Sequence, residues 1–267
     1  MADPCRICAT TAEPFARARL LGSVDADFER CPSCGLVMAA RPMWLNEAYS
    51  APITRLDIGL LDRCLLLSQV TAAILRAERL RRGRFLDWAG GYGAFTRLMR
   101  DRGYDFAHLD PMTHNVFAVG HQQFDLGDVR YDLVTGFEVL EHLEDPLAAL
   151  GPVARSTDRL LMTTQVLPEP TPRPGEWWYY ALETGQHITF FTRGALERMA
   201  ERLGYDGVAT GSFLHLFYRG TLSPMTRALV ARPQLAYGAG LMSTLLDRRH
   251  SLLARDVEMI TTGRRDG

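Results

Sequence analysis

Four of the five cysteines lie in the first 34 residues, as two C-x-x-C pairs formed by Cys5 with Cys8 and by Cys31 with Cys34. Each C-x-x-C turn directs two thiolates at one point, and two such turns complete the tetrahedral ligand set that a structural zinc ion prefers. Because four cysteines leave no open position for a substrate, the expected zinc site is structural. A disulfide pair or a redox C-x-x-C is less favoured, because no strand–helix redox unit surrounds either pair.

Two glutamates and a histidine follow one another closely at Glu138, Glu141 and His142. If the segment forms a helical turn, spacings of three and four residues place these side chains on one face, as a ligand set for a divalent cation. If it continues as a strand, Glu141 points away from the others. Two alternatives stay open: a metal-free general base at His142 or at His187, and a structural role in which the glutamates cap a turn.

A glycine-rich turn, DWAGGYG at 87–93, follows a predicted buried strand, where open α/β sheets bind ligands. Its glycines allow the backbone to approach a ligand closely. Asp110 ends the next predicted strand, where its carboxylate can accept hydrogen bonds from two ribose hydroxyls. The spacing does not fit the G-x-G-x-x-G of pyrophosphate binders, so we expect a nucleoside without phosphates. The candidate residues of the turn are Asp87, Ala89, Gly90, Gly91 and Gly93.

Four consecutive aromatic residues follow a proline-rich stretch at 168–176. The prolines exclude a helix or strand interior there, which predicts a loop that could cover a substrate. The aromatic side chains could stack on a sugar, an aryl ring or an acyl chain, or part of the run could pack into the core. These substrate candidates are Trp177, Trp178, Tyr179 and Tyr180.

The middle of the chain predicts the elements that must hold these residues. Strands alternate with helices from residue 84 onward, which is typical of a parallel, doubly wound sheet in an α/β fold. The predicted strands are 84–89, 105–110, 131–137 and 159–166, followed by two near 205–218. The predicted helices are 95–103, one that begins at 145, and 193–203.

The two ends of the chain predict smaller units. Residues 1–50 are too few for a large core and need the metal as a staple, so a zinc-ribbon-like module is expected. Residues 51–82 carry apolar residues at steps of three and four, which predicts a helical linker or lid. The main domain then covers 83–220, and 221–267 is expected to form a helical tail.

The composition limits the function classes. With 267 residues, 47% of them hydrophobic, the chain can bury the core of one domain with a small appendage. Thirty basic and thirty-one acidic residues give a net charge of −1, which disfavours nucleic acid as a partner. No segment approaches the roughly 20 apolar residues of a membrane span, and no signal peptide begins the chain. We therefore expect a cytoplasmic protein with a small-molecule partner; the oligomeric state stays open.

Over residues 83–220 the sequence resembles the class I S-adenosylmethionine-dependent methyltransferases. FLDWAGGYG matches their D-x-G-x-G-x-G signature, HLDP their ribose-binding acid, and YDLVTGFEVLEHLEDP the stretch at and after their fourth strand. The resemblance implies a Rossmann-like, seven-stranded sheet and S-adenosylmethionine held by the glycine turn, Asp110 and Phe137. Ala89 stands where the family has its first glycine, and Tyr92 where a small residue is common.

The first 50 residues carry a second resemblance. CRIC and CPSCGLVM resemble the zinc-binding module that precedes the methyltransferase domain in deoxysugar C-methyltransferases of antibiotic pathways. Those enzymes have a longer C-terminal region than the 47 residues that follow Gly220 here.

The E-x-x-E-H string, followed by TGQHITFF, resembles the metal site of small-RNA 2′-O-methyltransferases. In those enzymes two glutamates and two histidines hold a cation that binds vicinal hydroxyls, and the ubiquinone-pathway O-methyltransferases share the first part of the motif. The resemblance implies cation ligation by Glu138, Glu141, His142 and His187. Magnesium, manganese or iron(II) would suit such mixed oxygen and imidazole ligands.

The residues and the resemblances together predict an S-adenosylmethionine-dependent O-methyltransferase. The expected acceptor is a hydroxyl of a sugar or of a specialised, antibiotic-type metabolite, with a divalent cation as assistant. The alternatives are a C-methyltransferase of a nucleotide-linked deoxysugar, an RNA methyltransferase and a non-catalytic adaptor. RNA remains an alternative because a zinc module also precedes this domain in bacterial ribosomal-RNA guanine methyltransferases.

Overall fold

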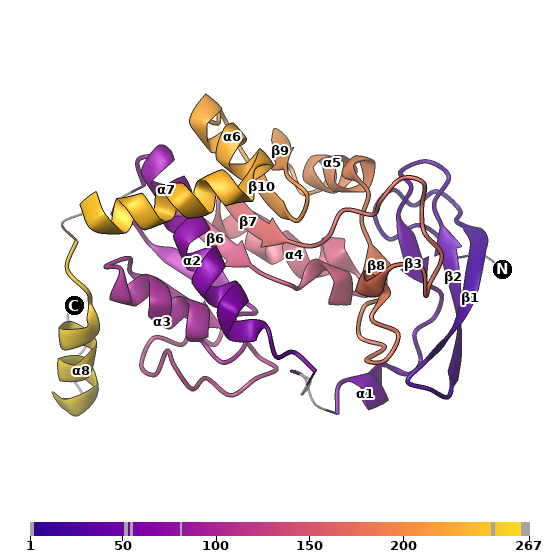
Figure 1. Cartoon of the computed structure of the whole chain (residues 1–267), viewed down its shortest axis with the longest axis horizontal. Coiled ribbons are helices and arrows are strands. Elements are labelled where there is room, and N and C mark those ends of the chain that lie inside the picture. The colour runs from indigo at the N-terminus through magenta and orange to yellow at the C-terminus, as the bar shows by residue number, and fades with distance from the viewer. Residues whose placement is uncertain (1–2, 51–52, 54–55, 81, 247–248, 263–267) are drawn as a thin grey trace.

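The computed structural model describes residues 3–50, 53, 56–80, 82–246 and 249–262, and it centres on a six-stranded sheet (Figure 1). The strand order is β5-β4-β6-β7-β10-β9. The first four of these strands run parallel, whereas β10 is antiparallel to both neighbours. The strands are β4 (Phe85–Trp88), β5 (Phe106–Leu109), β6 (Leu133–Gly136), β7 (Arg159–Thr163), β9 (Gly207–Thr210) and β10 (Leu214–Tyr218). The predicted α/β class and parallel sheet are confirmed.

The expected seventh strand of this sheet is not found in the described part of the chain. Beyond β5 there is only a single parallel bridge, between His108 and Gln122. The chain around this bridge is interrupted by Gly120 and Gly127, both at positive φ, a conformation that extended strands do not adopt. The sheet therefore ends at β5, with a loop in place of a further strand.

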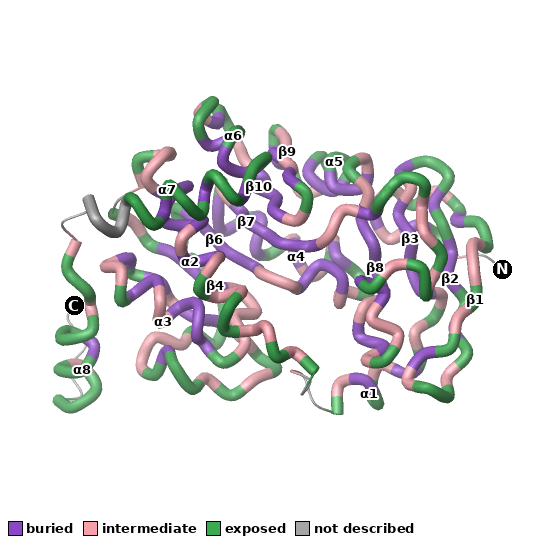
Figure 2. Tube along the Cα trace, in the orientation of Figure 1, coloured by how far each residue is buried: buried purple, intermediate pink, exposed green. Residues whose placement is uncertain are grey.

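Helices cover both faces of the sheet because its strands are apolar on both sides. Along β4, Phe85 packs into one core with α2 and α3, whereas Leu86 packs into the other with α4 and α5. The buried trace in Figure 2 follows the strands through the middle of the molecule. The helices are α2 (Leu60–Ala77), α3 (Ala94–Asp101), α4 (Pro146–Ser156) and α5 (Arg193–Arg202).

The N-terminal cysteine pairs sit beside a second, four-stranded antiparallel sheet of order β1-β2-β3-β8. Three of its strands come from the first 50 residues, and the fourth comes from far along the chain. A short helix, α1 (Leu45–Ala48), follows β3. We call β1 to β3 with the four cysteines the cysteine module. The strands are β1 (Glu13–Leu20), β2 (Val24–Arg30), β3 (Val37–Ala39) and β8 (Thr189–Phe190).

The segment predicted as a helical tail contains α6 (Pro224–Ala231), α7 (Pro233–Leu246) and α8 (Leu253–Thr262). Helix α8 is held to α3 through Asp256, whose buried carboxylate accepts from Arg97 and Arg100 at 2.6–2.9 Å. Residues 51–52, 54–55 and 81 of the predicted linker, and 247–248 and 263–267 of the tail, lie outside the described residues. None of the described helices is both long and apolar enough to cross a lipid bilayer.

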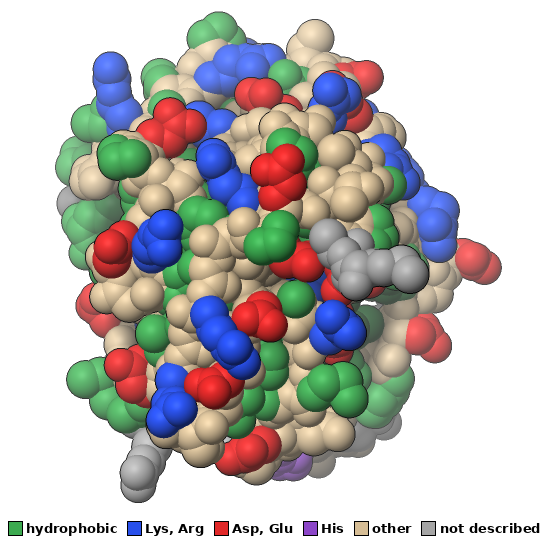
Figure 3. All heavy atoms as spheres, turned by 90° about the vertical axis from the view of Figure 1, so that its right-hand side faces the viewer, with side chains coloured by type: hydrophobic (Ala, Val, Ile, Leu, Met, Phe, Trp, Pro, Cys, Tyr) green, Lys and Arg blue, Asp and Glu red, His purple; other side chains and the backbone are tan. Residues whose placement is uncertain are grey.

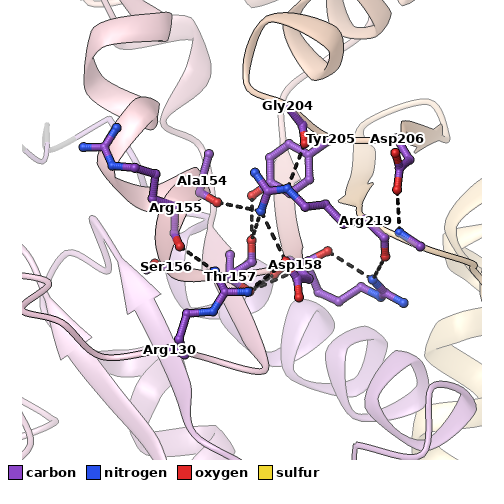
Figure 4. A network of polar contacts seen from close by, with 12 residues as sticks. Arg130, Ala154, Arg155, Ser156, Thr157, Asp158, Gly204, Tyr205, Asp206 and Arg219 are labelled. Carbon is purple, nitrogen blue, oxygen red and sulfur yellow. Dashed lines mark hydrogen bonds and ion pairs between the residues drawn. The ribbon is translucent and has the colours of Figure 1, made fainter.

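A polar network joins the residues just before β7 to Arg219, just after β10, in the antiparallel part of the sheet (Figure 4). The Arg219 guanidinium donates to the carbonyls of Ala154, Thr157, Leu203 and Gly204 and stacks on the Tyr205 ring at 4.3 Å. One side chain thereby satisfies carbonyls at the ends of α4 and α5. This network is structural, because its donors and acceptors satisfy one another.

Candidate functional site

A cavity of about 910 Å³ opens at the carboxyl ends of β4, β5 and β6. One part of its wall is the glycine turn with Asp110, which we call the glycine-turn end. Another part includes His142 and His187, which with Glu141 form what we call the Glu–His end. A cavity of this size at strand carboxyl ends is where α/β sheets bind ligands.

The backbone of the glycine turn is left-handed at three positions. Ala89, Gly91 and Gly93 have φ of 56°, 59° and 82°. A Cβ at Gly90 would lie 2.2 Å from the Asp87 carboxylate, so only glycine fits there. A Cβ at Gly91 would meet only one side-chain atom, of Ile53, at 3.3 Å. The turn therefore exposes its backbone to a ligand at Gly91. Gly93 is the N-cap of α3 and does not line the cavity.

Asp110 is bound to the turn that it was predicted to serve. Its Oδ2 accepts from the Gly91 amide at 2.8 Å, and its Oδ1 accepts from the amides of Met112 and Thr113 at 2.7 and 2.9 Å. An ionised carboxylate has about four acceptor positions, so roughly one remains for a ribose hydroxyl. Asp110 lines the cavity, and this remaining capacity is smaller than the two hydroxyls expected from the sequence.

Asp87 lies beneath the turn and is almost completely buried. Its carboxylate accepts from the hydroxyls of Thr135 and Thr96 at 2.9 and 3.0 Å. Burial raises the pKa of Asp87 to about 7, because neither hydroxyl carries a charge that would offset the loss of water. Phe137 lines the cavity nearby, with its ring edge-to-face on Phe95 at 4.8 Å.

The Glu–His end begins where β6 ends. Residues Leu140–His142 form one 3₁₀ turn, so the segment is the helical turn that the sequence allowed rather than a strand. Glu141 is 0% exposed, and neither carboxylate oxygen has a hydrogen-bond partner in the described part of the chain. One oxygen of Glu141 and one ring nitrogen each of His142 and His187 lie within 4.8 Å of one another.

The phenol of Tyr179 is close to Glu141 in the same buried region. Burial and the charge of Glu141 raise the pKa of Tyr179, yet the phenol pairs with Thr164 at 3.2 Å. A buried carboxylate without partners is costly, and such groups mark positions where a ligand or an ion completes the bonding.

The two histidines use the same ring nitrogen, Nδ1, for a backbone hydrogen bond. Nδ1 of His142 lies 3.1 Å from the carbonyl of Gln186, and Nδ1 of His187 lies 2.7 Å from that of Tyr179. Since a carbonyl only accepts, each Nδ1 carries a proton, and in the neutral form of each ring Nε2 keeps its lone pair. Burial and the neighbouring His187 lower the pKa of His142 to about 3, so its ring is neutral near pH 7.

Glu138 lies outside this group of three. Its carboxylate accepts from the Thr163 hydroxyl at 2.8 Å, and its backbone is left-handed, with φ of 54°. Burial and the nearby Glu141 raise the pKa of Glu138 to about 7. Glu138 still lines the cavity. The four side chains expected to act together are thus divided into three clustered ligand candidates and one separate acid.

The aromatic run is also divided. Trp178 is 74% exposed and lines the cavity together with Tyr179. Trp177 and Tyr180 do not line it; they pack against Phe28 and Phe190 under the cysteine module. The stretch at Trp178–Tyr180 is a 3₁₀ turn, so neighbouring side chains face different directions.

The four N-terminal cysteines converge as predicted. Their sulfurs lie 3.6 Å (Cys5–Cys34), 3.4 Å (Cys8–Cys31) and 3.8 Å (Cys8–Cys34) apart. These distances exclude disulfides, whose sulfurs lie about 2.0 Å apart, and all four cysteines are free. Tetrahedral zinc–sulfur bonds of about 2.3 Å require sulfurs about 3.8 Å apart, so the cluster has compatible geometry.

Sequence reasoning missed two groups in the cavity wall. Tyr49, after α1, places its ring edge-to-face on His142 at 6.2 Å. Arg63 of α2 is the single arginine among the described residues of the lining, and it donates to both oxygens of Asp57 at 2.7 and 2.8 Å. Neither belongs to a spaced motif, because each reaches the cavity from an element far from the glycine turn in sequence.

Comparisons with known proteins give one family match. A family model described as a methyltransferase domain matches residues 63–210. A search of curated proteins finds no match.

Several solved structures are similar at low identity. CalO1, a methyltransferase of calicheamicin biosynthesis, is similar at 21% identity with a TM-score of 0.42, over 58% of this chain and 54% of its own. An O-methyltransferase family protein from Burkholderia thailandensis has 17% identity and a TM-score of 0.47, over 61% and 59%. Human N-acetylserotonin methyltransferase has 17% identity and a TM-score of 0.44, over 67% and 55%. The chain spans little more than half the length of these structures.

Proposed function

The chain belongs to the methyltransferase-domain family, and we propose that it transfers the methyl group of S-adenosylmethionine to an oxygen of a small molecule. One observation carries this proposal: a single cavity is lined both by the glycine turn with Asp110 and by His142 and His187. A methyl donor bound beside the glycine turn and an acceptor bound beside the histidines would share one cavity, as positioning requires.

The glycine-turn end has the features needed to hold an adenosine. Bare backbone at Gly91 allows close approach, and Asp110 keeps one acceptor position for a ribose hydroxyl. Phe137 offers an apolar edge nearby. S-adenosylmethionine, when bound, supplies an electrophilic methyl group on a positively charged sulfur.

The Glu–His end has the features needed to prepare a hydroxyl. An attacking hydroxyl must lose its proton, and the Nε2 lone pair of His187 is available to accept it. His142 is a weaker base near neutral pH, because its pKa lies near 3. Its neutral ring is instead the form that binds a metal.

We propose further that a divalent cation occupies the Glu–His end. Glu141, His142 and His187 would hold it, since Glu141 has two buried oxygens without partners among the described residues and both histidines use Nδ1, not Nε2, on a backbone carbonyl. Such an ion would act as a Lewis acid that lowers the pKa of a bound hydroxyl. The Nδ1 hydrogen bonds to Gln186 and Tyr179 would fix both rings in the ligating tautomer.

We also assign a structural zinc ion to the cysteine module, in line with the sulfur separations. The acceptor is proposed to be a hydroxyl of a sugar or specialised metabolite. The exposed Trp178 ring would give such a ligand one face to stack on, with the Tyr179 ring edge-to-face beside it at 5.2 Å. Figure 3 supports a small molecule over RNA, because arginine and acidic side chains alternate on the face of the cysteine module that it shows.

Titration calorimetry with S-adenosylmethionine tests the assignment of the donor. Asp110→Ala should weaken binding by roughly 10- to 100-fold, because a hydrogen bond to a charged group contributes about 1.5–3 kcal/mol. The exposed Asp128, on the loop beyond β5, provides the control, and Asp128→Asn should bind normally. Normal binding by Asp110→Ala, or no binding by the wild-type chain, would contradict the proposal.

Chelation tests the cation. A chelator too weak to remove zinc from four cysteines should slow methyl transfer, and magnesium, manganese or iron(II) should restore it. If protein that retains one zinc ion and no other metal turns over at an unchanged rate, the cation proposal fails. His187 would then act as a base without a metal.

A further inference from the structure

We propose that Arg6, on the turn between the first two cysteines, positions His187, so that the cysteine module forms part of the support of the Glu–His end. The inference rests on the proposed function and deepens it. It assigns a role to a residue that no spaced motif in the sequence indicated.

The Arg6 guanidinium joins two segments that are distant in sequence. Its Nη1 donates to the Ile188 carbonyl at 3.0 Å and to the Thr189 hydroxyl at 2.5 Å, and its Nη2 donates to the Ala39 carbonyl at 2.6 Å. Ile188 and Thr189 are the two residues that follow His187. The side chain therefore holds the backbone that carries the histidine.

The same segment is the last strand of the module's sheet. Val37 of β3 pairs with Phe190 of β8, Met38 pairs with Thr189, and the Ala39 amide donates to the Ile188 carbonyl at 2.9 Å. The Ile188 carbonyl thus accepts from both β3 and Arg6. A strand of two residues forms few ladder bonds, so the guanidinium supplies a large part of its fixation.

The other side of this segment is bound to the turn that carries the remaining ligands. The Ile188 amide donates to the Glu141 carbonyl at 2.8 Å, and the Thr189 hydroxyl donates to the Leu143 carbonyl at 3.0 Å. Residues 188–189 therefore lie between the module and the 3₁₀ turn. A shift of this segment moves His187 relative to Glu141.

The position of the His187 ring depends on this backbone. Its one polar contact in the described part of the chain is Nδ1 to the Tyr179 carbonyl at 2.7 Å, and its ring meets those of His142 and Tyr179 at 4.8 and 4.7 Å. A misplacement of about 1 Å at a reacting group can reduce a rate by about 100-fold. Arg6 is a positioning residue in this account, because it acts through residues 188 and 189.

Steady-state kinetics of Arg6→Ala tests the proposal. We expect kcat to fall about 10- to 100-fold while the Kd for S-adenosylmethionine stays within about 2-fold, because the glycine-turn end is untouched. Arg6→Lys keeps the charge but cannot reach three acceptors in a fork, so it should recover only part of the rate. The control is Arg17→Ala. Arg17 lies on β1 of the same module and forms an ion pair with Asp27, and both side chains are exposed. This variant should retain normal kcat.

A second readout does not depend on turnover. In nitrogen-15 spectra of the histidine rings, the Nδ1 proton of His187 should exchange faster with water in Arg6→Ala than in the wild-type chain. Unchanged exchange together with unchanged kcat would overturn the proposal. In a variant that remains folded, a loss of S-adenosylmethionine binding as large as the loss of kcat would also overturn it, because the effect would then reach both ends of the cavity.

Thr189→Val covers the case in which Arg6→Ala does not fold. It removes one acceptor of Arg6 and the donor to Leu143 while keeping the side-chain shape. A smaller loss of kcat in the same direction is expected, with faster exchange of the same proton. If the wild-type chain fails to bind S-adenosylmethionine, the proposed function fails, but the exchange measurement still decides the role of Arg6.

Discussion

The two ends of the cavity differ in how far the chain itself satisfies their buried acids. At the glycine-turn end, Asp110 accepts hydrogen bonds from three backbone amides, and Asp87 accepts hydrogen bonds from two hydroxyls. At the Glu–His end, both oxygens of buried Glu141 have no hydrogen-bond partner among the described residues. The chain itself supplies the partners of both acids at the first end, whereas at the second end the proposed cation would supply the partner that Glu141 does not have among the described residues.

Under the proposed function, Asp87 and Asp110 shape the site, whereas Glu141 acts in it. A buried polar group with partners contributes to stability, and one without them lowers it by about 1–3 kcal/mol. Unfavourable groups persist where function needs them. Glu141 is buried without a partner among the described residues, and Glu138 has a left-handed backbone. Asp87 with its two threonines is the opposite case.

The largest expected effect is that of Glu141→Gln. This substitution should reduce methyl transfer by roughly 10²- to 10⁴-fold, because it removes an anionic ligand from the Glu–His end. The free energy of unfolding at pH 7 should stay the same or rise, since a neutral amide is less costly to bury than a carboxylate. Kinetics and urea unfolding measure the two quantities on one preparation.

Glu201→Gln is the matched control, because Glu201 is exposed on α5 and pairs only with Arg198 in the described part of the chain. It should alter neither quantity. A destabilised Glu141→Gln protein with normal turnover would remove the contrast between the two ends and identify Glu141 as structural.

The next effect concerns the glycine-turn end and pH. The pKa of Asp87 is about 7 in the folded chain and 3.8 as a free side chain, so the folded form binds the extra proton between these values. Its contribution to stability is complete below pH 3.8 and is lost as the pH rises through 7. Stability should therefore fall with pH in this window, by at most about 1.4 kcal/mol per unit.

Asp87→Asn removes this titration and keeps a side chain that can bond both threonine hydroxyls. We expect a flatter dependence of the free energy of unfolding on pH between about 4 and 7, measured by urea titration at several pH values. Equal slopes for the variant and the wild-type chain would show that Asp87 keeps an ordinary pKa in the folded state.

The smallest effect tests the backbone of the same turn. Ala89 and Gly91 are both left-handed, but only one of them is glycine. Ala89→Gly should raise the free energy of unfolding, and Gly91→Ala should lower it, each by about 1 kcal/mol. Urea unfolding measures both changes. Changes of opposite sign in the free energy of unfolding would support the left-handed backbone at both positions, whereas a lower free energy of unfolding in both variants would mean that Ala89 is not strained.

Sequence reasoning succeeded where neighbouring residues alone set the outcome. The C-x-x-C spacing predicted the four converging sulfurs, and alternating strands and helices predicted the parallel sheet. It failed for the seventh strand, because two glycines at positive φ break the segment beyond β5. It could not separate Trp178 from Trp177, because the backbone changes from extended at Trp177 to a 3₁₀ turn at Trp178. Trp178 lines the cavity, whereas Trp177 packs against the core.

The sequence by itself determined the residue types: a cysteine set suited to zinc, a glycine turn with an acid beyond it, and a string of acids and histidines. Such features depend on spacing within a few residues, which backbone geometry fixes locally. Only the tertiary structure decided that Glu141 is buried without a partner among the described residues, that Glu138 stands apart, and that Arg6 reaches the strand behind His187. Those outcomes depend on packing between segments that are as far apart in sequence as Arg6 and Thr189. No local sequence pattern encodes such packing.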